Sequence, residues 1–394
     1  MKTRIFSILF ILASLATGCV SEFNAKLTSD EQQILIVDGN IIGNSNVTFY
    51  LSKSYSMDST YASSDIFDVN AKIIITGSDG YKSSPAINQG NGKYSIDVGT
   101  LDDNVKYGIQ IEYDGDTYQS TLSTPVYTPE IDSISWVQPE QNGAIHFRVS
   151  THDDETEEAK FFLWDYAETW EIAADYYTLI FLDLQTNKFY SIAPAPYYYC
   201  WRNDASNSYM VGSTESLTEN SIINKEIYQG DPQDDRFSIL YSVLVNQKAI
   251  SKAAYDYYQN KIKLNEQMGG LFSPQPSEVS GNIICTTNPS KRAMGYVEVC
   301  KNTTQKRIFV SRFQITRPSI YNNCQTITND SVLIRLSEMN GTYVDFYNLG
   351  YRPAGDFSPF NRTLPAEWAI KYCTDCVANG GSKEKPDFWP NDDK

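Results

Sequence analysis

The feature that most constrains the fold of this chain is a series of Asp-Gly and Asn-Gly pairs between short runs of β-branched and aromatic residues. The pairs are Asp38-Gly39, Asp79-Gly80, Asn91-Gly92 and Asp114-Gly115. Such dipeptides tolerate the positive φ angles of tight hairpin turns, so the alternating runs around them predict antiparallel strands. About seven strands within roughly 95 residues predict an immunoglobulin-like β-sandwich over residues 32–127.

A second β-rich domain is predicted over residues 128–394. It begins after a proline-containing boundary and includes an aromatic, strand-like stretch from Phe161 to Trp170. Apolar residues recur near helical spacing across 247–268 and stop at Gly269-Gly270, which predicts one prominent helix inserted among strands. The fold class is therefore mainly β, and further strands are expected near 281–287, 293–300, 306–314 and 331–336.

Residues 1–18 have the pattern of a lipoprotein signal peptide. Lys2 and Arg4 precede an apolar run too short to span a bilayer comfortably, and the run ends in Leu15-Ala16-Thr17-Gly18-Cys19. Small residues before a cysteine resemble a bacterial lipobox, although Ala16 stands where Leu is usual. We therefore predict that the Cys19 thiol is acylated, that residues 19–31 form a tether, and that acyl chains anchor the protein to a membrane. An ordinary secretory signal or an uncut anchor is the alternative.

The six cysteines after Cys19 predict disulfide bonds, because an even number in an exported chain is typical of a disulfide framework. Cys373 and Cys376 also have zinc or redox spacing, but a zinc ribbon needs a second such pair and a redox motif needs a βαβ unit. We therefore expect structural bridges and no metal site. A turn at 288–291 would place Cys285 opposite residue 294, which argues against a bridge to Cys300. The candidates are Cys200, Cys285, Cys300, Cys324, Cys373 and Cys376.

Charge and histidine content narrow the classes of function. With 32 basic and 48 acidic residues, the chain has a formal charge of −16, which argues against a nucleic-acid partner. It contains two histidines, His146 and His152, and it lacks the motifs of nucleophilic hydrolases, zinc proteases, phosphate loops and dinucleotide sites. We expect His146 on the polar phase of its strand, no catalytic residues and no cofactor. A surface hydrolase with paired carboxylates is the remaining enzyme class.

The abundance of tyrosine, 28 residues in all, favours a binding role. Aromatic faces offer a large contact area and stack on sugars, peptides and planar ligands. Trp164 and Trp170 are expected in the core, whereas two prolines after position 193 place the next side chains in a loop. The candidate ligand-binding residues are Tyr197, Tyr198, Tyr199 and Trp201, with burial in the core as the alternative for Trp201.

The order of several motifs resembles Bacteroidota outer-membrane lipoproteins grouped as domain of unknown function 4249. The most specific part is the predicted helix followed by Pro274-Gln275-Pro276-Ser277 and Gly281-Asn282-Ile283. The resemblance implies partnership with a TonB-dependent outer-membrane transporter in nutrient uptake, and it carries over no catalytic residues. Other matching stretches are 37–41, 129–134, 168–171, 236–238, 271–273, 295–296, 307–309 and 385–390.

We therefore expect an outer-membrane lipoprotein that acts as the accessory binding component of a TonB-dependent uptake system. A cell-surface adhesion or structural lipoprotein with immunoglobulin-like domains is the alternative. In this lineage, acidic residues after the lipidated cysteine mark export to the cell surface. Only Glu22 is present there. We therefore expect surface exposure, although the sequence does not determine which face of the outer membrane the protein occupies.

Overall fold

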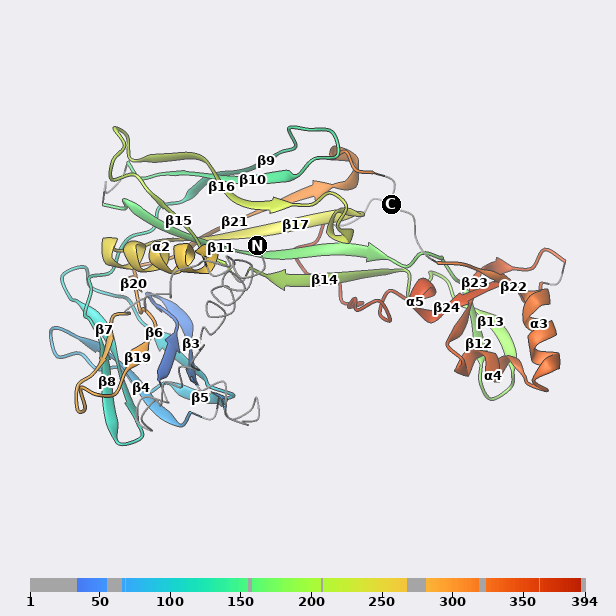
Figure 1. The fold of residues 1–394 in the computed structure, drawn as a ribbon, viewed down its shortest axis with the longest axis horizontal. Coiled ribbons are helices and arrows are strands. Elements are labelled where there is room, and N and C mark those ends of the chain that lie inside the picture. The colour runs from blue at the N-terminus through green and yellow to red at the C-terminus, as the bar shows by residue number, and fades with distance from the viewer. Residues whose placement is uncertain are drawn as a thin grey trace, which may run out of the picture.

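The computed structural model describes residues 34–54, 66–67, 69–154, 158–206, 208–267, 281–318, 324–360 and 362–390. The predicted signal peptide, Cys19 and the tether lie outside these residues. The chain is mainly β and forms three parts, of which one lies beneath one end of the central part and another extends from its opposite end (Figure 1). We call them the sandwich (residues 35–120 and 283–300), the central region (131–173, 199–267 and 304–315) and the distal subdomain (174–198 and 324–378).

The sandwich consists of two sheets with strand orders β19-β1-β3-β6-β5 and β18-β8-β7-β4, whose inner faces share one core. Alternate residues of β3 point inward, namely Val47, Phe49 and Leu51. Asn91-Gly92 and Asp114-Gly115 have positive φ angles and form the predicted turns β5–β6 and β7–β8. The strands are β1 (Leu35–Asp38), β2 (Ile41–Ile42), β3 (Ser45–Lys53), β4 (Ala71–Gly77), β5 (Ile87–Gly90), β6 (Lys93–Val98), β7 (Tyr107–Tyr113), β8 (Asp116–Ser120), β18 (Ile283–Cys285), β19 (Ala293–Met294) and β20 (Val299–Cys300).

The sandwich is not one continuous stretch of sequence, which corrects the predicted domain of residues 32–127. Strand β18 pairs antiparallel with β8, while β19 and β20 pair parallel with β1 and β2. Ile283, Val297 and Val299 are buried in the sandwich core. Residues 283–300 belong to the sandwich because their apolar side chains fill this core, a contact that no local pattern predicts.

The central region packs two sheets, β16-β10-β9 and β14-β11-β17-β21, with β15 also paired to β11. Trp164 and Trp170 of β11 lie in the core between them, as expected. The indole N–H of Trp164 donates to Gln247 Oε1 at 2.8 Å, which satisfies the only polar atom of a fully buried side chain. The strands are β9 (Ile131–Val137), β10 (Ile145–His152), β11 (Phe161–Ala173), β14 (Tyr199–Ala205), β15 (Met210–Ser213), β16 (Ser221–Gly230), β17 (Leu240–Ala249) and β21 (Thr304–Ser311).

The predicted helix is α2 (Lys252–Gln267), which covers the outer face of β11 with Ala254 and Tyr258. It begins later than the predicted residue 247 because 240–249 continue as strand β17. Ser251 marks the change, since its hydroxyl accepts a hydrogen bond from the backbone N–H of Ala254 at 3.2 Å. Within the described ranges, no helix is long and apolar enough to cross a membrane.

The distal subdomain is built from a hairpin, a small sheet ordered β22-β24-β23 and three short helices. The strand predicted at 331–336 is wrong, because these residues form helix α3. The Thr328 hydroxyl accepts from the Ser331 N–H at 3.3 Å, and Val332 and Leu336 pack on Trp368. This spacing of four residues is helical. The elements are β12 (Ile180–Asp183), β13 (Lys188–Ser191), β22 (Ile327–Thr328), α3 (Asn329–Glu338), α4 (Tyr343–Asn348), β23 (Tyr351–Phe357), β24 (Pro365–Ile370) and α5 (Lys371–Thr374).

Candidate functional site

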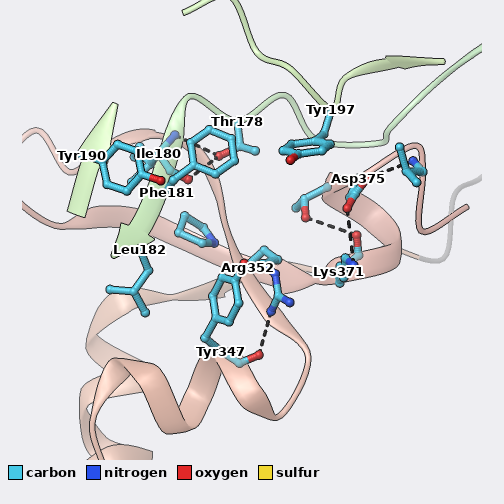
Figure 2. A pocket seen from close by; sticks show the side chains of 13 residues that line it. Thr178, Ile180, Phe181, Leu182, Tyr190, Tyr197, Tyr347, Arg352, Lys371 and Asp375 are labelled. Atoms are coloured by element: carbon cyan, nitrogen blue, oxygen red, sulfur yellow. Dashed lines mark hydrogen bonds and ion pairs between the residues drawn. The ribbon is translucent and has the colours of Figure 1, made fainter. Parts of the chain in front are cut away.

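The distal subdomain contains a cavity of about 360 Å³ beside the β12–β13 hairpin (Figure 2). Its aromatic lining comes from three segments, namely the hairpin, the loop before β14 and the end of α4. Its charged lining comes from β23 and from the segment around α5. The side chains discussed below are Phe181, Tyr190, Tyr197, Tyr347, Arg352, Lys371, Thr374 and Asp375.

Tyr197 is the one predicted binding residue that lines this cavity. Its backbone carbonyl accepts from the Cys376 N–H at 2.9 Å, which ties the loop to the segment after α5. Tyr198 and Tyr199 pack edge-to-face with ring centroids 4.6 Å apart. Trp201 is half-buried in β14, where its backbone pairs with Ser382. The four candidates therefore do not form one platform.

Arg352 is held in a fixed orientation at the cavity wall. Its Nη1 donates to the carbonyl oxygens of Tyr347 and Tyr351, both at 2.7 Å. Its guanidinium carbon lies 3.3 Å from the centroid of the Tyr347 ring, a cation–π contact (Figure 2). Burial lowers the pKa of Arg352 from its ordinary value, opposed by the charges of Tyr347 and Asp375. An arginine remains protonated at neutral pH despite such a shift.

The wall beside Arg352 is a segment that we call the strap, residues 371–378, which follows β24, the strand paired with β23. The Asp375 carboxylate accepts from the Val377 N–H at 2.9 Å and lies 3.7 Å from Lys371 Nζ. Two disulfides leave this segment in different directions, from Cys373 to Cys324 and from Cys376 to Cys200. The strap is therefore fixed both to the distal subdomain and to strand β14 of the central region.

Two of the six predicted disulfide cysteines are not paired. Cys285 and Cys300 are buried free thiols, because they lie in different surroundings. Cys285 belongs to the sandwich core, whereas the Cys300 Sγ lies 3.6 Å from the Ala249 carbonyl of the central region. Burial raises the pKa of Cys300 to about 12, so its thiol is protonated and unreactive at neutral pH.

In the part of the chain that the structure describes, one group of side chains has ligand atoms close enough for a metal ion, namely Asp175, Cys324 and Cys373. Both sulfur atoms belong to a disulfide, and metal binding needs the thiolate form. This group is therefore a poor metal site in the oxidised chain.

The two histidines lie in β10, outside the cavity. His146 Nδ1 is 2.8 Å from Glu226 Oε2, and His152 Nδ1 is 2.7 Å from Asp132 Oδ1. The hydrogen bond from His146 lowers the pKa of Glu226. Each histidine therefore pairs with a carboxylate at the surface of the central region.

Sequence reasoning missed most of the cavity, including Phe181, Tyr190, Arg352, Lys371 and Asp375. These residues come from segments nearly 200 positions apart, and they match no motif. The available signal was the Cys373-x-x-Cys376 spacing, since residues between two bridged cysteines have a fixed backbone.

A family model described as Domain of unknown function (DUF4249) matches residues 20–306 of this chain, which is more than half of its length. The match includes Phe181, Tyr190 and Tyr197 but ends before Arg352 and the strap. Residues 307–309 and 385–390, which contribute to the resemblance noted from the sequence, also lie beyond it. No curated protein matches the chain.

Proposed function

We propose, since this chain belongs to the DUF4249 family, that it is a lipid-anchored binding protein of the outer membrane that delivers a small ligand to a TonB-dependent transporter. The observation that carries the proposal is the cavity of the distal subdomain. Its volume of about 360 Å³ lies in the range of small-molecule sites, which are mostly apolar with a few fixed polar groups. Aromatic walls around an oriented arginine fit that description.

The arrangement of the parts supports a role at a membrane surface. The proposed lipidated residue, Cys19, precedes β1, the first strand of the sandwich, in the chain. The distal subdomain lies at the other end of the long axis (Figure 1). The cavity therefore lies at the opposite end of the molecule from the part that follows the proposed anchor, which suits capture of a ligand away from the lipid surface.

Purification of the tagged full-length protein from native outer membrane in mild detergent tests the partnership. We expect a TonB-dependent transporter to co-purify in stoichiometric amount, and we expect Cys19→Ser to release the protein from the membrane fraction. Recovery of the lipoprotein alone, together with unchanged growth of a deletion strain on every transporter-dependent nutrient, would overturn the uptake role.

A matched pair of variants tests whether the cavity serves uptake. Tyr197→Ala removes a ring from the cavity lining, whereas Tyr199→Ala removes an exposed ring, 40% accessible, that does not line it. We expect only Tyr197→Ala to reduce growth on the transporter's nutrient. Equal effects of the two variants on growth would show that the cavity is not needed for uptake.

An adhesive role is the second candidate, favoured by the sandwich, because immunoglobulin-like folds are common in cell-surface domains. The sandwich exposes the apolar side chains of Ile87 and Ile284, at 69% and 66% accessibility. Adhesion predicts that deletion of the protein abolishes attachment of cells to a surface, and retained attachment rejects it.

A further inference from the structure

We infer that the ligand of the cavity carries a carboxylate beside a flat or apolar ring, an inference that rests on the binding function proposed above. Two source classes share this chemistry and fit the space, namely acidic sugars and the C-terminal residue of a peptide. The inference depends on Arg352, on the charge balance of the cavity and on its aromatic wall.

Arg352 presents a free edge suited to two oxygen atoms. Both hydrogen bonds of its guanidinium to the described residues leave from Nη1 and go to backbone carbonyls. The donors on Nε and Nη2 remain on the adjacent edge. That edge matches the spacing of the two oxygens of a carboxylate, which an arginine binds through paired, charge-assisted hydrogen bonds.

The cavity has an excess of positive charge. Asp375 is the carboxylate of its lining, and it is already engaged by the N–H groups of Val377 and Ala378, at 2.9 and 3.3 Å, and by nearby Lys371. The lining thus carries two cations, Arg352 and Lys371, against this one carboxylate, which leaves a net charge of +1. In a chain of net charge −16, a local cationic cavity concentrates anions against the overall field.

The aromatic wall explains the second part of the ligand. The Phe181 ring lies 6.1 Å from the Tyr190 ring and 5.9 Å from the Tyr197 ring, measured between centroids. Lys383 Nζ lies over the Tyr197 ring at 4.6 Å and adds a cation near this wall. The rings are tilted to one another by 37° and 55° and offer adjoining apolar faces on which a sugar or aromatic ring packs.

Calorimetric titration of the mature chain with two matched pairs of probes tests the inference. The pairs are glucuronate with glucose, and N-acetyltyrosine with its uncharged amide. We expect the acid of at least one pair to bind about tenfold or more tightly than its neutral partner. The pair that shows the preference identifies the source as an acidic sugar or a peptide terminus.

Two variants locate the preference. Arg352→Gln should reduce the acid's affinity to that of the neutral partner, with Tyr199→Ala as a control that retains the preference. Because Arg352 also bonds to backbone carbonyls, Lys371→Gln provides a second variant at a half-exposed side chain. It should weaken acid binding about two- to fivefold without a change in unfolding temperature.

Equal binding of acid and neutral probes, or no binding of either acid, would overturn the inference. Co-purification with a transporter and the growth defect of Tyr197→Ala do not depend on these probes. If both results are obtained although the acids do not bind, the proposed function holds with a different ligand class. If neither result is obtained, the proposed function is rejected.

Discussion

The sandwich and the distal subdomain use cysteine in opposite ways. The sandwich has a continuous core that runs from Leu35 to Val299, and its Cys285 is a buried free thiol. The distal subdomain has two small separate clusters, one around Trp368 and one around Ala354. Both disulfides of the described residues end on its strap. The difference shows that cross-links occur where burial of apolar side chains is too limited to hold the structure.

The largest difference in the free energy of unfolding is expected between loss of a core aromatic side chain and loss of a cavity-lining one. Trp164→Ala removes a fully buried ring and its hydrogen bond to Gln247, so we expect a loss of about 3–5 kcal/mol in the free energy of unfolding. Tyr197→Ala, at the cavity, should lose less than about 1 kcal/mol. Urea denaturation measures both, and similar losses would show that the cavity is part of a packed core.

Loss of a disulfide should destabilise the distal subdomain more than loss of a free thiol destabilises the sandwich. Cys324→Ala with Cys373→Ala should destabilise the distal subdomain by about 2–4 kcal/mol and abolish binding at the cavity, because the strap loses one attachment. Cys285→Ala is the matched control in the sandwich and should lose no more than about 1 kcal/mol. Thermal unfolding with and without reductant checks this. A reductant effect on the sandwich transition as large as that on the distal one would contradict the comparison.

A smaller effect is expected at the start of α3. Thr328→Ala removes the hydroxyl that accepts from the Ser331 N–H, which should destabilise the distal subdomain by about 1 kcal/mol. Thr328→Ser keeps the hydroxyl and should have little effect. Hydrogen exchange of the α3 amides distinguishes them, and equal protection in both variants would show that the cap is not needed.

The smallest effect is a pH dependence confined to the central region. The hydrogen bond to Asp132, followed by its charge, raises the pKa of His152 above 6.5. The stabilisation is therefore complete below pH 6.5 and is lost as the pH rises through the raised folded value. Because His152 is half exposed, we expect only about 0.5 kcal/mol. His152→Gln should remove this dependence, and the distal subdomain, which contains no histidine, should show none near neutral pH.

Short-range signals predicted the local elements better than the assembly. Asn91-Gly92 and Asp114-Gly115 form the hairpin turns that their chemistry dictates. The prediction of a strand at 331–336 is wrong, because Val332 and Leu336 recur at helical spacing after the Thr328 cap. The return of 283–300 to the sandwich depends on pairing with β8, about 165 residues earlier, and with β1 and β2, 258 residues earlier. No local pattern encodes such a contact.

The cavity was predictable only at Tyr197, for which composition and two prolines indicated an exposed aromatic loop. Arg352 and Lys371 look like ordinary charged residues in sequence, since their role depends on which segments fold against them. Disulfide connectivity has the same limitation. Cys373 and Cys376 are three positions apart, yet their partners are 49 and 176 residues away.

The return of residues 283–300 to the sandwich has a mechanical consequence. The chain passes between the sandwich and the central region three times, between β8 and β9, between α2 and β18, and between β20 and β21. A single linker would let the two parts swivel about one point. The two described connections, 121–130 and 301–303, are hydrogen-bonded to each other through Thr128 and Asn302 and so resist torsion. The sandwich lies near one end of the long axis and the distal subdomain at the other (Figure 1). The orientation of the sandwich relative to the central region therefore also affects the direction that the cavity faces.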